Sequence, residues 1–296
     1  MRINQYARKP LRDDSAIFAG VLDEVIRDVP YSSAGSLQQF YGSEPPEWRW
    51  GRGCGWQAFE VARRIEEQGG PTATFMVSGG HVPALYVESA AITVLDPYMP
   101  HVAPLRLERA DAVDSVVRAE VDAYPIRAGR NGEPAPSRLR GTWWTLDGSL
   151  RLEYLRYGPC REDYAPYRAY TFRPASMLPV PPPDGLMRRI LVSPMQNNLS
   201  IRTVHRDDRR MREIVLPFTG RPRDQLVDRS RLITKDNQGA VSPYGSAGFD
   251  RDLEPMADTI GCAPADLVEF VMDSAVLYDK AAPRDRVWPE YSAVSE

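Results

Sequence analysis

The chain of 296 residues contains little cysteine. Its three cysteines, Cys54, Cys160 and Cys262, are far apart in the sequence, and none belongs to a Cys-x-x-Cys pair. An odd number of widely spaced cysteines argues against a disulfide framework and against a zinc site. We therefore expect three free thiols in a cytoplasmic protein, and the sequence assigns no role to Cys160 or Cys262.

Long hydrophobic runs and an excess of basic residues are also absent. No stretch approaches the roughly 18 consecutive apolar residues that a membrane-spanning helix requires. The first residues, MRINQYARKPLRDD, lack the apolar core of a secretory signal. The formal net charge of -3 argues against a general nucleic-acid binder. We expect neither membrane nor nucleic acid among the partners.

Histidine is equally scarce, with three in the whole chain. His101 and His205 have no neighbours at metal-ligand spacing, so we expect no metal site, and the sequence assigns these two no role. The remaining one, His81, precedes two short apolar runs in GHVPALYVESAAITVLDPY, which ends just after Asp96. If these runs pair as antiparallel strands centred on Glu88-Ser89, His81 and Asp96 lie opposite each other on one face, with Cβ atoms about 5 Å apart.

The hydrophobic pattern predicts helices at both ends of the chain and strands between them. Helical periodicity covers residues 14–40, with a break at VPYSSAG, and returns from Cys54 to Glu67. A further helix is predicted from Leu107 to Ala123, and two more between Asp250 and Leu277, separated at GCAPAD. Strands are predicted at TATFMV, VPALYV, AITVLD, YRAYTF, ILVSPMQNNLSIRTV and MREIVLPF, and TWWTLDGSLRLEYLRY is predicted as a hairpin that turns at Asp147-Gly148. This order indicates an α+β fold.

Cys54 opens the second predicted helix, on the apolar stripe that it forms with Ala58, Val61 and Ile65. A helix N-terminus favours a thiolate, and a neighbouring imidazolium favours it further. The glycines of GRGCG leave backbone N–H groups to hold an oxyanion. A thiol, a base, a carboxylate that orients the base and oxyanion donors are the parts that acyl transfer needs. We therefore expect the Cys54 sulfur to contact a ring nitrogen of His81.

Each of these residues alone has a structural interpretation. A cysteine at a helix start is usually a small core residue, a histidine on a strand is usually a satisfied polar group, and Asp96 could begin an Asp-Pro turn. The combination of Cys54, His81 and Asp96 on a helix start, a strand foot and a strand end favours the catalytic interpretation.

The order of these three residues resembles the Cys-His-Asp triad that arylamine N-acetyltransferases share with transglutaminase-like cysteine enzymes. Several segments are similar to the acetyltransferase branch: DEVIRDVPYSSAG, YRAYTFRP with VSPMQNNLSIRTV, and GFDRDLEPMADTIGCAPADL. The resemblance implies a papain-like core in three parts. These are a helical domain over 1–70 that carries the nucleophile, an antiparallel β-barrel over 71–185 that carries the histidine and aspartate, and a C-terminal α/β lid over 186–296.

The chain also departs from the acetyltransferase pattern. It has Trp50-Gly51-Arg52-Gly53-Cys54 where that family has Arg-Gly-Gly-x-Cys, and Trp56 where the family has a glutamate. The interval from Cys54 to His81 is shorter than in the family. These departures argue against the usual acetyl-CoA and arylamine substrates. They leave the expected thiol chemistry of Cys54 unchanged.

The resemblance implies a cysteine-dependent N-acyltransferase with no permanently bound cofactor. Cys54 is the expected nucleophile, His81 the base and Asp96 its orienting acid. The expected substrates are an acyl thioester, on CoA or an acyl carrier protein, and a small-molecule amine. Substrate contacts are expected from Tyr31, Gly53, Gly55 and Trp56, and the donor phosphates are a candidate ligand for Arg206 to Arg212. A transglutaminase-like cysteine hydrolase or amidase and a non-catalytic binding protein remain open alternatives, because a triad does not name its second substrate.

Overall fold

The computed structural model describes residues 14–178, 184–193, 196–218 and 225–288. Within these ranges, six α-helices and three antiparallel sheets confirm the predicted α+β class. Short 3₁₀ turns lie at Trp48–Trp50, Arg109–Asp111, Pro174–Ser176 and Arg229–Arg231.

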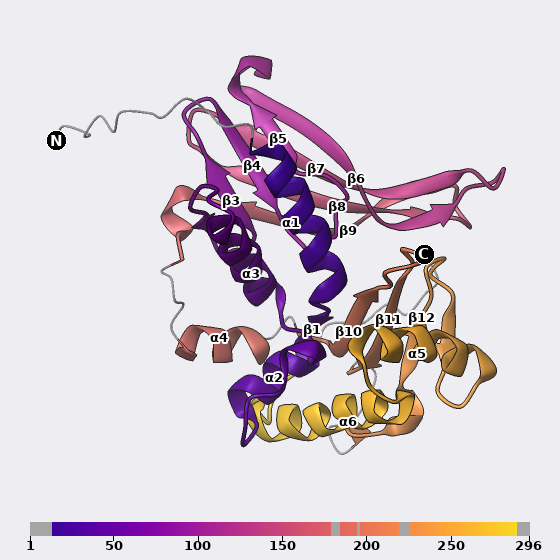
Figure 1. Cartoon of the computed structure of the whole chain (residues 1–296). Helices are drawn as coiled ribbons and strands as arrows, with labels where there is room; N and C mark the ends of the chain where they lie inside the picture. The colour runs from indigo at the N-terminus through magenta and orange to yellow at the C-terminus, as the bar shows by residue number, and fades with distance from the viewer. Residues whose placement is uncertain (1–13, 179–183, 194–195, 219–224, 289–296) are drawn as a thin grey trace.

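Two helices of the N-terminal third cover the first sheet. Helix α1 (Ser15–Asp28) lies beside α3 (Cys54–Glu67), and α3 contacts β3 (Figure 1). The sheet has the order β2-β3-β4-β5, with bounds Thr74–Phe75, Ala84–Val87, Ala91–Leu95 and Leu105–Glu108. All five residues of β4 are buried, because one face of this inner strand packs in the core with α1 and α3 and the other face packs against the second sheet. The predicted strands at TATFMV, VPALYV and AITVLD are confirmed.

The second sheet forms the long arm at the upper right of Figure 1. Its strands follow one another in the order β6-β7-β8-β9, with bounds Val116–Ala128, Pro134–Trp144, Leu150–Gly158 and Asp163–Phe172. The hairpin predicted around Asp147-Gly148 is confirmed as the β7–β8 turn. The predicted barrel is wrong in one respect, since no sheet in the described residues closes on itself. Strand β5 packs against β6 and β7 without entering their hydrogen-bonded ladder.

The helix predicted from Leu107 to Ala123 is wrong. Those residues end β5, make one 3₁₀ turn and begin β6. In β5, buried Leu105 and Leu107 alternate with Arg106 and Glu108, which is the two-residue period of a half-buried strand. The segment is extended because β5 pairs with β4 and β6 pairs with β7. The local hydrophobic pattern does not reveal either pairing.

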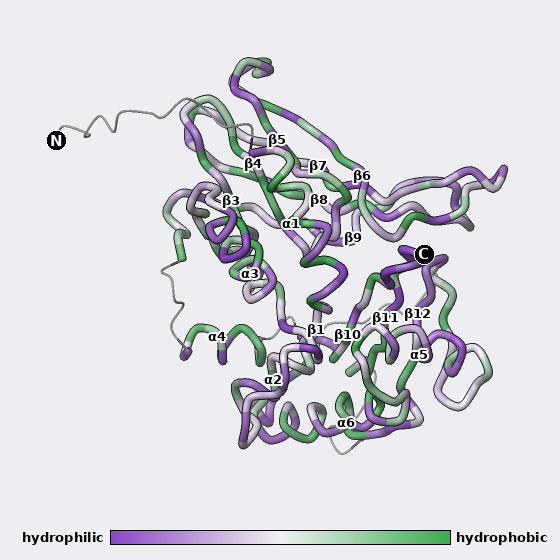
Figure 2. The backbone as a smooth tube through the Cα atoms, in the orientation of Figure 1, coloured by the Kyte–Doolittle hydropathy of each residue, from purple (hydrophilic) through white to green (hydrophobic). Residues whose placement is uncertain are grey.

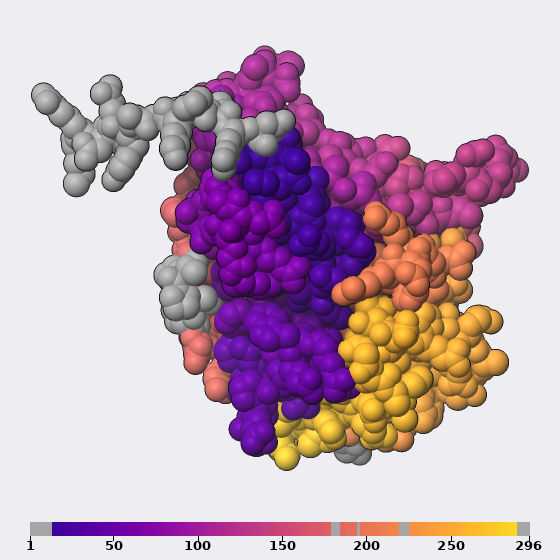
Figure 3. All heavy atoms as spheres, viewed as in Figure 1, coloured from indigo at the N-terminus to yellow at the C-terminus, as the bar shows by residue number. Residues whose placement is uncertain are grey.

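The third sheet joins the two ends of the chain. Its order is β1-β10-β11-β12-β13, with bounds Tyr31–Ser32, Asn198–Val204, Met211–Pro217, Ile233–Lys235 and Val241–Pro243. Strand β1 therefore comes from the predicted helical domain, and α2 (Ser33–Tyr41), which follows it, packs on the C-terminal helix α6 (Pro264–Ala281). Figure 3 shows the indigo N-terminal surface directly against the yellow C-terminal one. The boundaries at 70 and 185 stay a prediction.

Helices α5 (Ala247–Ile260) and α6 cover this sheet and confirm the two predicted C-terminal helices. Hydrophobic and hydrophilic stretches alternate along α6 (Figure 2), as expected for a helix with one buried face. Pro264 occupies the first turn of α6, where its missing N–H costs nothing. Helix α4 (Asp184–Leu191) takes in Ile190 and Leu191, so the strand predicted from Ile190 begins only at Asn198.

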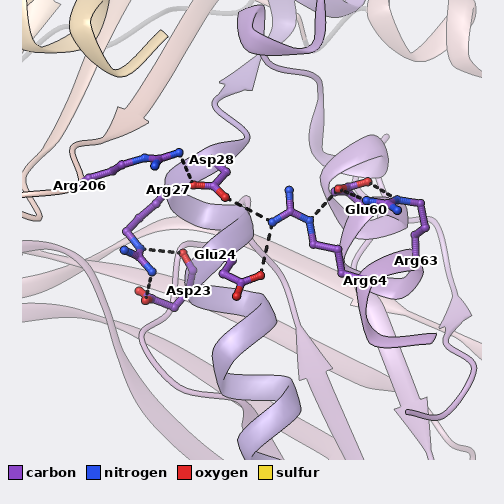
Figure 4. Close-up of polar contacts among 8 residues, drawn as sticks. All are labelled: Asp23, Glu24, Arg27, Asp28, Glu60, Arg63, Arg64 and Arg206. Atoms are coloured by element: carbon purple, nitrogen blue, oxygen red, sulfur yellow. Dashed lines mark hydrogen bonds and ion pairs between the residues drawn. The ribbon is translucent and has the colours of Figure 1, made fainter. Parts of the chain in front are cut away.

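Charged side chains link the outer faces of α1 and α3. Arg64 on α3 lies between Glu60, 2.7 Å away, and Glu24 and Asp28 on α1, 3.6 and 3.4 Å away (Figure 4). Asp28 also forms an ion pair with Arg206, at 2.7 Å. These ion pairs join the solvent-facing sides of α1 and α3. They also pair Arg206 with a carboxylate of the protein itself.

Candidate functional site

The segment that leads to Cys54 is held by backbone hydrogen bonds to the residues on either side of Tyr31. Arg52 N–H donates to the carbonyl of Pro30 at 3.1 Å, and Ser32 N–H donates to the carbonyl of Arg52 at 2.9 Å. The buried Arg52 guanidinium donates to the carbonyls of Pro46, Glu47 and Gly51, and burial lowers its pKa. Arg52, where the resembled family has glycine, is thus a structural residue that ties the 46–52 loop to the start of α3.

The approach to Cys54 differs from the prediction in the role of Gly53. Its N–H donates to Ser36 Oγ at 2.7 Å, so it is not free to hold an oxyanion. Cys54 and Gly55 are the first two residues of α3, and their N–H groups make no backbone hydrogen bond within the described residues. The first N–H groups of a helix have no intrahelical acceptor. The available oxyanion donors are therefore Cys54 N–H and Gly55 N–H.

The strand register places His81 and Asp96 on one face, although it differs from the predicted one. Ala84 pairs with Leu95 and Val87 with Ile92, so the turn is centred on Ser89-Ala90 and not on Glu88-Ser89. Continuing this register puts Asp96 level with Pro83, two residues from His81. An offset of two residues keeps both side chains on the same face, because side-chain direction along a strand repeats every two residues.

The imidazole and the carboxylate are in direct contact. His81 Nε2 lies 2.6 Å from Asp96 Oδ2, and both side chains are almost completely buried. The other carboxylate oxygen, Oδ1, accepts hydrogen bonds from the N–H groups of Tyr98 and Met99. These contacts leave Oδ2 directed at the ring, which is the arrangement that orients a catalytic histidine.

His101 supports this aspartate, a role that the sequence did not reveal. Its Nε2 accepts the Asp96 backbone N–H at 2.9 Å, and its Nδ1 donates to the carbonyl of Ala103 at 2.6 Å. Burial lowers the pKa of His101 and keeps the ring neutral, as this pair of hydrogen bonds requires. The only sequence signal for this contact is the spacing Asp-x-x-x-x-His. That spacing brings the two residues together only because the chain turns between them.

The charge on His81 depends on its two partners. Burial opposes a charged imidazole, but the Asp96 carboxylate and the Cys54 sulfur outweigh it and raise the pKa of His81 to about 10. The Cys54 thiol donates to the carbonyl of Gly80 at 3.6 Å, and His81 Nδ1 makes no aligned hydrogen bond in the described residues. The sulfur and the ring are nevertheless close, since both the charge of Cys54 and a hydrogen bond to it contribute to the raised pKa of His81. Catalytic contacts of this kind are often loose before substrate binds.

These groups open into a cavity of about 770 Å³, a size typical of small-molecule sites. Cys54, His81, Tyr31, Gly53 and Gly55 all line it. Trp56 does not, since its ring packs edge-on against Phe59. The His81 ring is flanked by Tyr98 and Tyr170, with centroids 4.9 and 4.4 Å away. The cavity thus joins the triad to an aromatic wall.

The polar lining residues that the sequence did not predict include Tyr98, Arg168, Arg202 and Glu213. Arg168 Nε lies 3.4 Å from the Tyr98 hydroxyl, and Arg202 donates to the Tyr98 carbonyl at 2.5 Å. Burial disfavours the Tyr98 phenolate, but the two guanidiniums outweigh this effect and lower the pKa of Tyr98. The three charged residues come from β9, β10 and β11, far from the triad in sequence, so no local motif connects them to it.

The arginines proposed for donor phosphates lie elsewhere. Arg206 pairs with Asp28, Arg209 with Asp23, and Arg212 with Asp208 at 2.9 Å. None of the residues from Arg206 to Arg212 lines the cavity that holds Cys54. Arg210 and Arg212 line a separate cavity of about 280 Å³.

Three further findings concern the whole described chain. Cys54, Cys160 and Cys262 are all free thiols. The described residues contain no cluster of histidine, cysteine and carboxylate side chains suited to hold a metal ion. Of the helices that the structure describes, none combines the length and the hydropathy that crossing a membrane requires.

Ser36→Ala tests whether the loop before Cys54 must be held. Ser33→Ala is the matched control, because Ser33 is also buried on α2 but binds the Ser200 backbone instead. Each variant should lose about 1–2 kcal/mol of unfolding free energy with its hydrogen bond. Only Ser36→Ala should also slow alkylation of Cys54 by iodoacetamide, about tenfold. Equal alkylation rates in the two variants would contradict a positioning role for Ser36.

Comparison with known proteins gave no match, whether against family models, curated proteins or solved structures.

Proposed function

We propose that this chain is a cysteine-dependent N-acyltransferase acting in the cytoplasm. The observation that carries the proposal is the placement of Cys54 at the start of α3, beside His81, which Asp96 holds at 2.6 Å. The cavity of about 770 Å³ gives this thiol access to a small molecule. The resemblance of the triad to that of arylamine N-acetyltransferases supports transfer in preference to hydrolysis.

The proposed reaction has two half-reactions. The Cys54 thiolate attacks the carbonyl carbon of an acyl thioester, and the tetrahedral oxyanion receives hydrogen bonds from Cys54 N–H and Gly55 N–H. The C–S bond to the donor breaks, and the donor thiolate leaves with the proton of His81. An amine then attacks the acyl-cysteine, its proton passes to His81, and Cys54 leaves as thiolate. Asp96 Oδ2 holds the ring through both steps.

The donor is proposed to be acyl-CoA or an acyl carrier protein, and no resident cofactor takes part. Tyr31, Gly53 and Gly55 are proposed substrate contacts, since they line the cavity with Cys54. Trp56 and the Arg206 to Arg212 segment are left out of the proposal, because they lie outside this cavity.

Intact-mass analysis tests the proposal directly. The protein is mixed with a panel of short, branched and aromatic acyl-CoA thioesters, and with acyl carrier protein thioesters. A mass increase equal to the acyl group is expected on the parent and on Cys262→Ala, which removes another partly buried free thiol, but not on Cys54→Ala.

The competing functions give different results in the same experiment. Labelling of Cys54→Ala equal to that of the parent, or no adduct from any thioester, would refute the proposal. Cleavage of peptide amides in place of thioester capture would favour the hydrolase. An acyl adduct that a panel of amines removes no faster than water alone would also exclude transfer.

A further inference from the structure

One wall of the cavity is a row of side chains across the third sheet. Tyr31 on β1 pairs with Arg202 on β10, and Arg202 pairs with Glu213 on β11. Directly paired residues in antiparallel strands point to the same face, with Cβ atoms about 5 Å apart. All three line the cavity that contains Cys54. The row therefore places a phenol, a guanidinium and a carboxylate side by side on its wall.

Glu213 is a mostly buried carboxylate that stands between Arg202 on β10 and Lys235 on β12, and of these two cations Arg202 lines the cavity with it. Its exposed fraction is 8%, and within the described part of the chain its side chain makes neither an ion pair nor a hydrogen bond. Arg202 stands directly opposite, yet no ion pair joins the two. Burying a charge is costly unless another charge or hydrogen bond compensates it. This carboxylate is consequently available to a ligand that enters the cavity.

Arg202 is fixed in place by other contacts. Its guanidinium lies between the rings of Tyr31 and Tyr98, 5.0 and 5.1 Å from their centroids. One of its N–H groups donates to the Tyr98 carbonyl at 2.5 Å, and this is its only side-chain hydrogen bond in the described residues. The exposed fraction of Arg202 is 6%. Because the guanidinium has several donors in a rigid fork, the others remain for a ligand.

The two charges together select the ligand. A simple cation beside Glu213 would also meet Arg202, and a simple anion beside Arg202 would also meet Glu213. A head group with both charges satisfies both residues at once, through charge-assisted hydrogen bonds. An α-amino acid carries its carboxylate and its ammonium on one carbon, which matches two neighbouring side chains of a strand pair.

Tyr31 relates this wall to the nucleophile. Burial raises the pKa of Tyr31, and the negative charges of Tyr98, Cys54 and Glu213 raise it further. Tyr31 is thus near both Cys54 and Glu213. A molecule held at Arg202 and Glu213 can extend past Tyr31 and present its other end to the acyl-cysteine.

We propose that Arg202 and Glu213 form a subsite for the zwitterionic head group of an α-amino acid acceptor. Arg202 binds the carboxylate, Glu213 binds the α-ammonium, and a side-chain amine reaches the acyl group on Cys54. The acceptor class is then a diamino acid of the lysine or ornithine type. This assignment rests on the proposed acyl transfer and names its second substrate.

Binding to the Cys54→Ala protein tests the subsite without turnover. Thermal shift and calorimetry are run with norleucine, which has the head group and an apolar side chain, and with hexanoate and pentylamine, which each keep one of its two charges. Norleucine should bind at least tenfold more tightly than either. Equal binding of pentylamine or hexanoate, or no binding of norleucine, would overturn the subsite.

Second variants in the same background locate the binding. Glu213→Gln and Arg202→Gln should each weaken norleucine binding by roughly tenfold or more. Arg212→Gln is the matched control, because Arg212 neighbours Glu213 on β11 and therefore points to the opposite face. Equal weakening by Arg212→Gln would place the ligand elsewhere. Since acyl adduct formation on the parent is measured separately, failure of the subsite and failure of the acyltransferase proposal are distinguishable.

Discussion

Replacement of Asp96 by asparagine is expected to lower the rate of Cys54 acylation by about 10³-fold. The wild-type carboxylate lies 2.6 Å from His81 Nε2 and helps to raise the pKa of His81 to about 10. A neutral amide removes that charge and can present an N–H group to the ring, which stabilises the wrong tautomer. The fold should persist, because the amide oxygen can still accept from the N–H groups of Tyr98 and Met99.

The pH dependence of alkylation measures this effect without a known substrate. In the proposed mechanism, the imidazolium of His81 supports the Cys54 thiolate that attacks the acyl donor. In the Asp96→Asn variant the pKa of His81 falls from about 10, so the imidazolium and its effect on alkylation should be lost at a pH lower by about one unit or more. Asp252→Asn is the matched control, since Asp252 is also buried but binds Thr234 in the third sheet. A folded Asp96→Asn protein with the parent's profile would exclude Asp96 from the chemistry.

Gly51→Ala is expected to destabilise the protein by about 3 kcal/mol or more. Gly51 has φ 72° and ψ 178°, a backbone region that is essentially restricted to glycine. A Cβ there would also clash with the carbonyl oxygen of Pro30, which holds the loop through Arg52 N–H. The loop before Cys54 would have to move, so alkylation of Cys54 should slow together with the loss of stability.

Gly20→Ala is the control for the same change of residue. Gly20 lies in the exposed interior of α1, and a Cβ there would meet no heavy atom within 4 Å. This variant should be more stable than the parent by about 0.5–1 kcal/mol, because alanine favours the helix. Denaturation midpoints that move in opposite directions would confirm the assignment. Similar midpoints for the two variants would contradict the strain at Gly51.

The sequence predicted the triad because each of its residues belongs to a local pattern. Cys54 follows a glycine-rich turn and begins an amphipathic helix, and His81 and Asp96 flank two apolar runs. The predicted contact between His81 and Asp96 is present although the turn centre was placed one residue too early, and the catalytic roles of the three residues stay a prediction. The prediction did not extend to Gly53, whose N–H is taken by Ser36 on a different helix.

The rest of the site depends on pairings between distant segments. Arg202 and Glu213 reach the cavity only because β10 pairs with β1, which lies about 170 positions earlier in the chain. The segment from Leu107 to Ala123 is a similar case, since its conformation depends on β4 and β7 more than on its own periodicity. The pattern of a single sequence does not show which distant strands pair. For the same reason the predicted closed barrel was wrong, since no sheet in the described residues closes on itself.

The pairing of β1 with β10 also has a consequence for synthesis of the protein on the ribosome. A nascent chain carries Cys54, His81 and Asp96 long before it reaches residue 204, but Tyr31 and Ser32 have no strand to pair with until then. The turn that presents the thiol is bonded through Arg52 to Pro30 and Ser32, on either side of Tyr31. The thiol therefore gains its final surroundings only after about two thirds of the polypeptide has emerged.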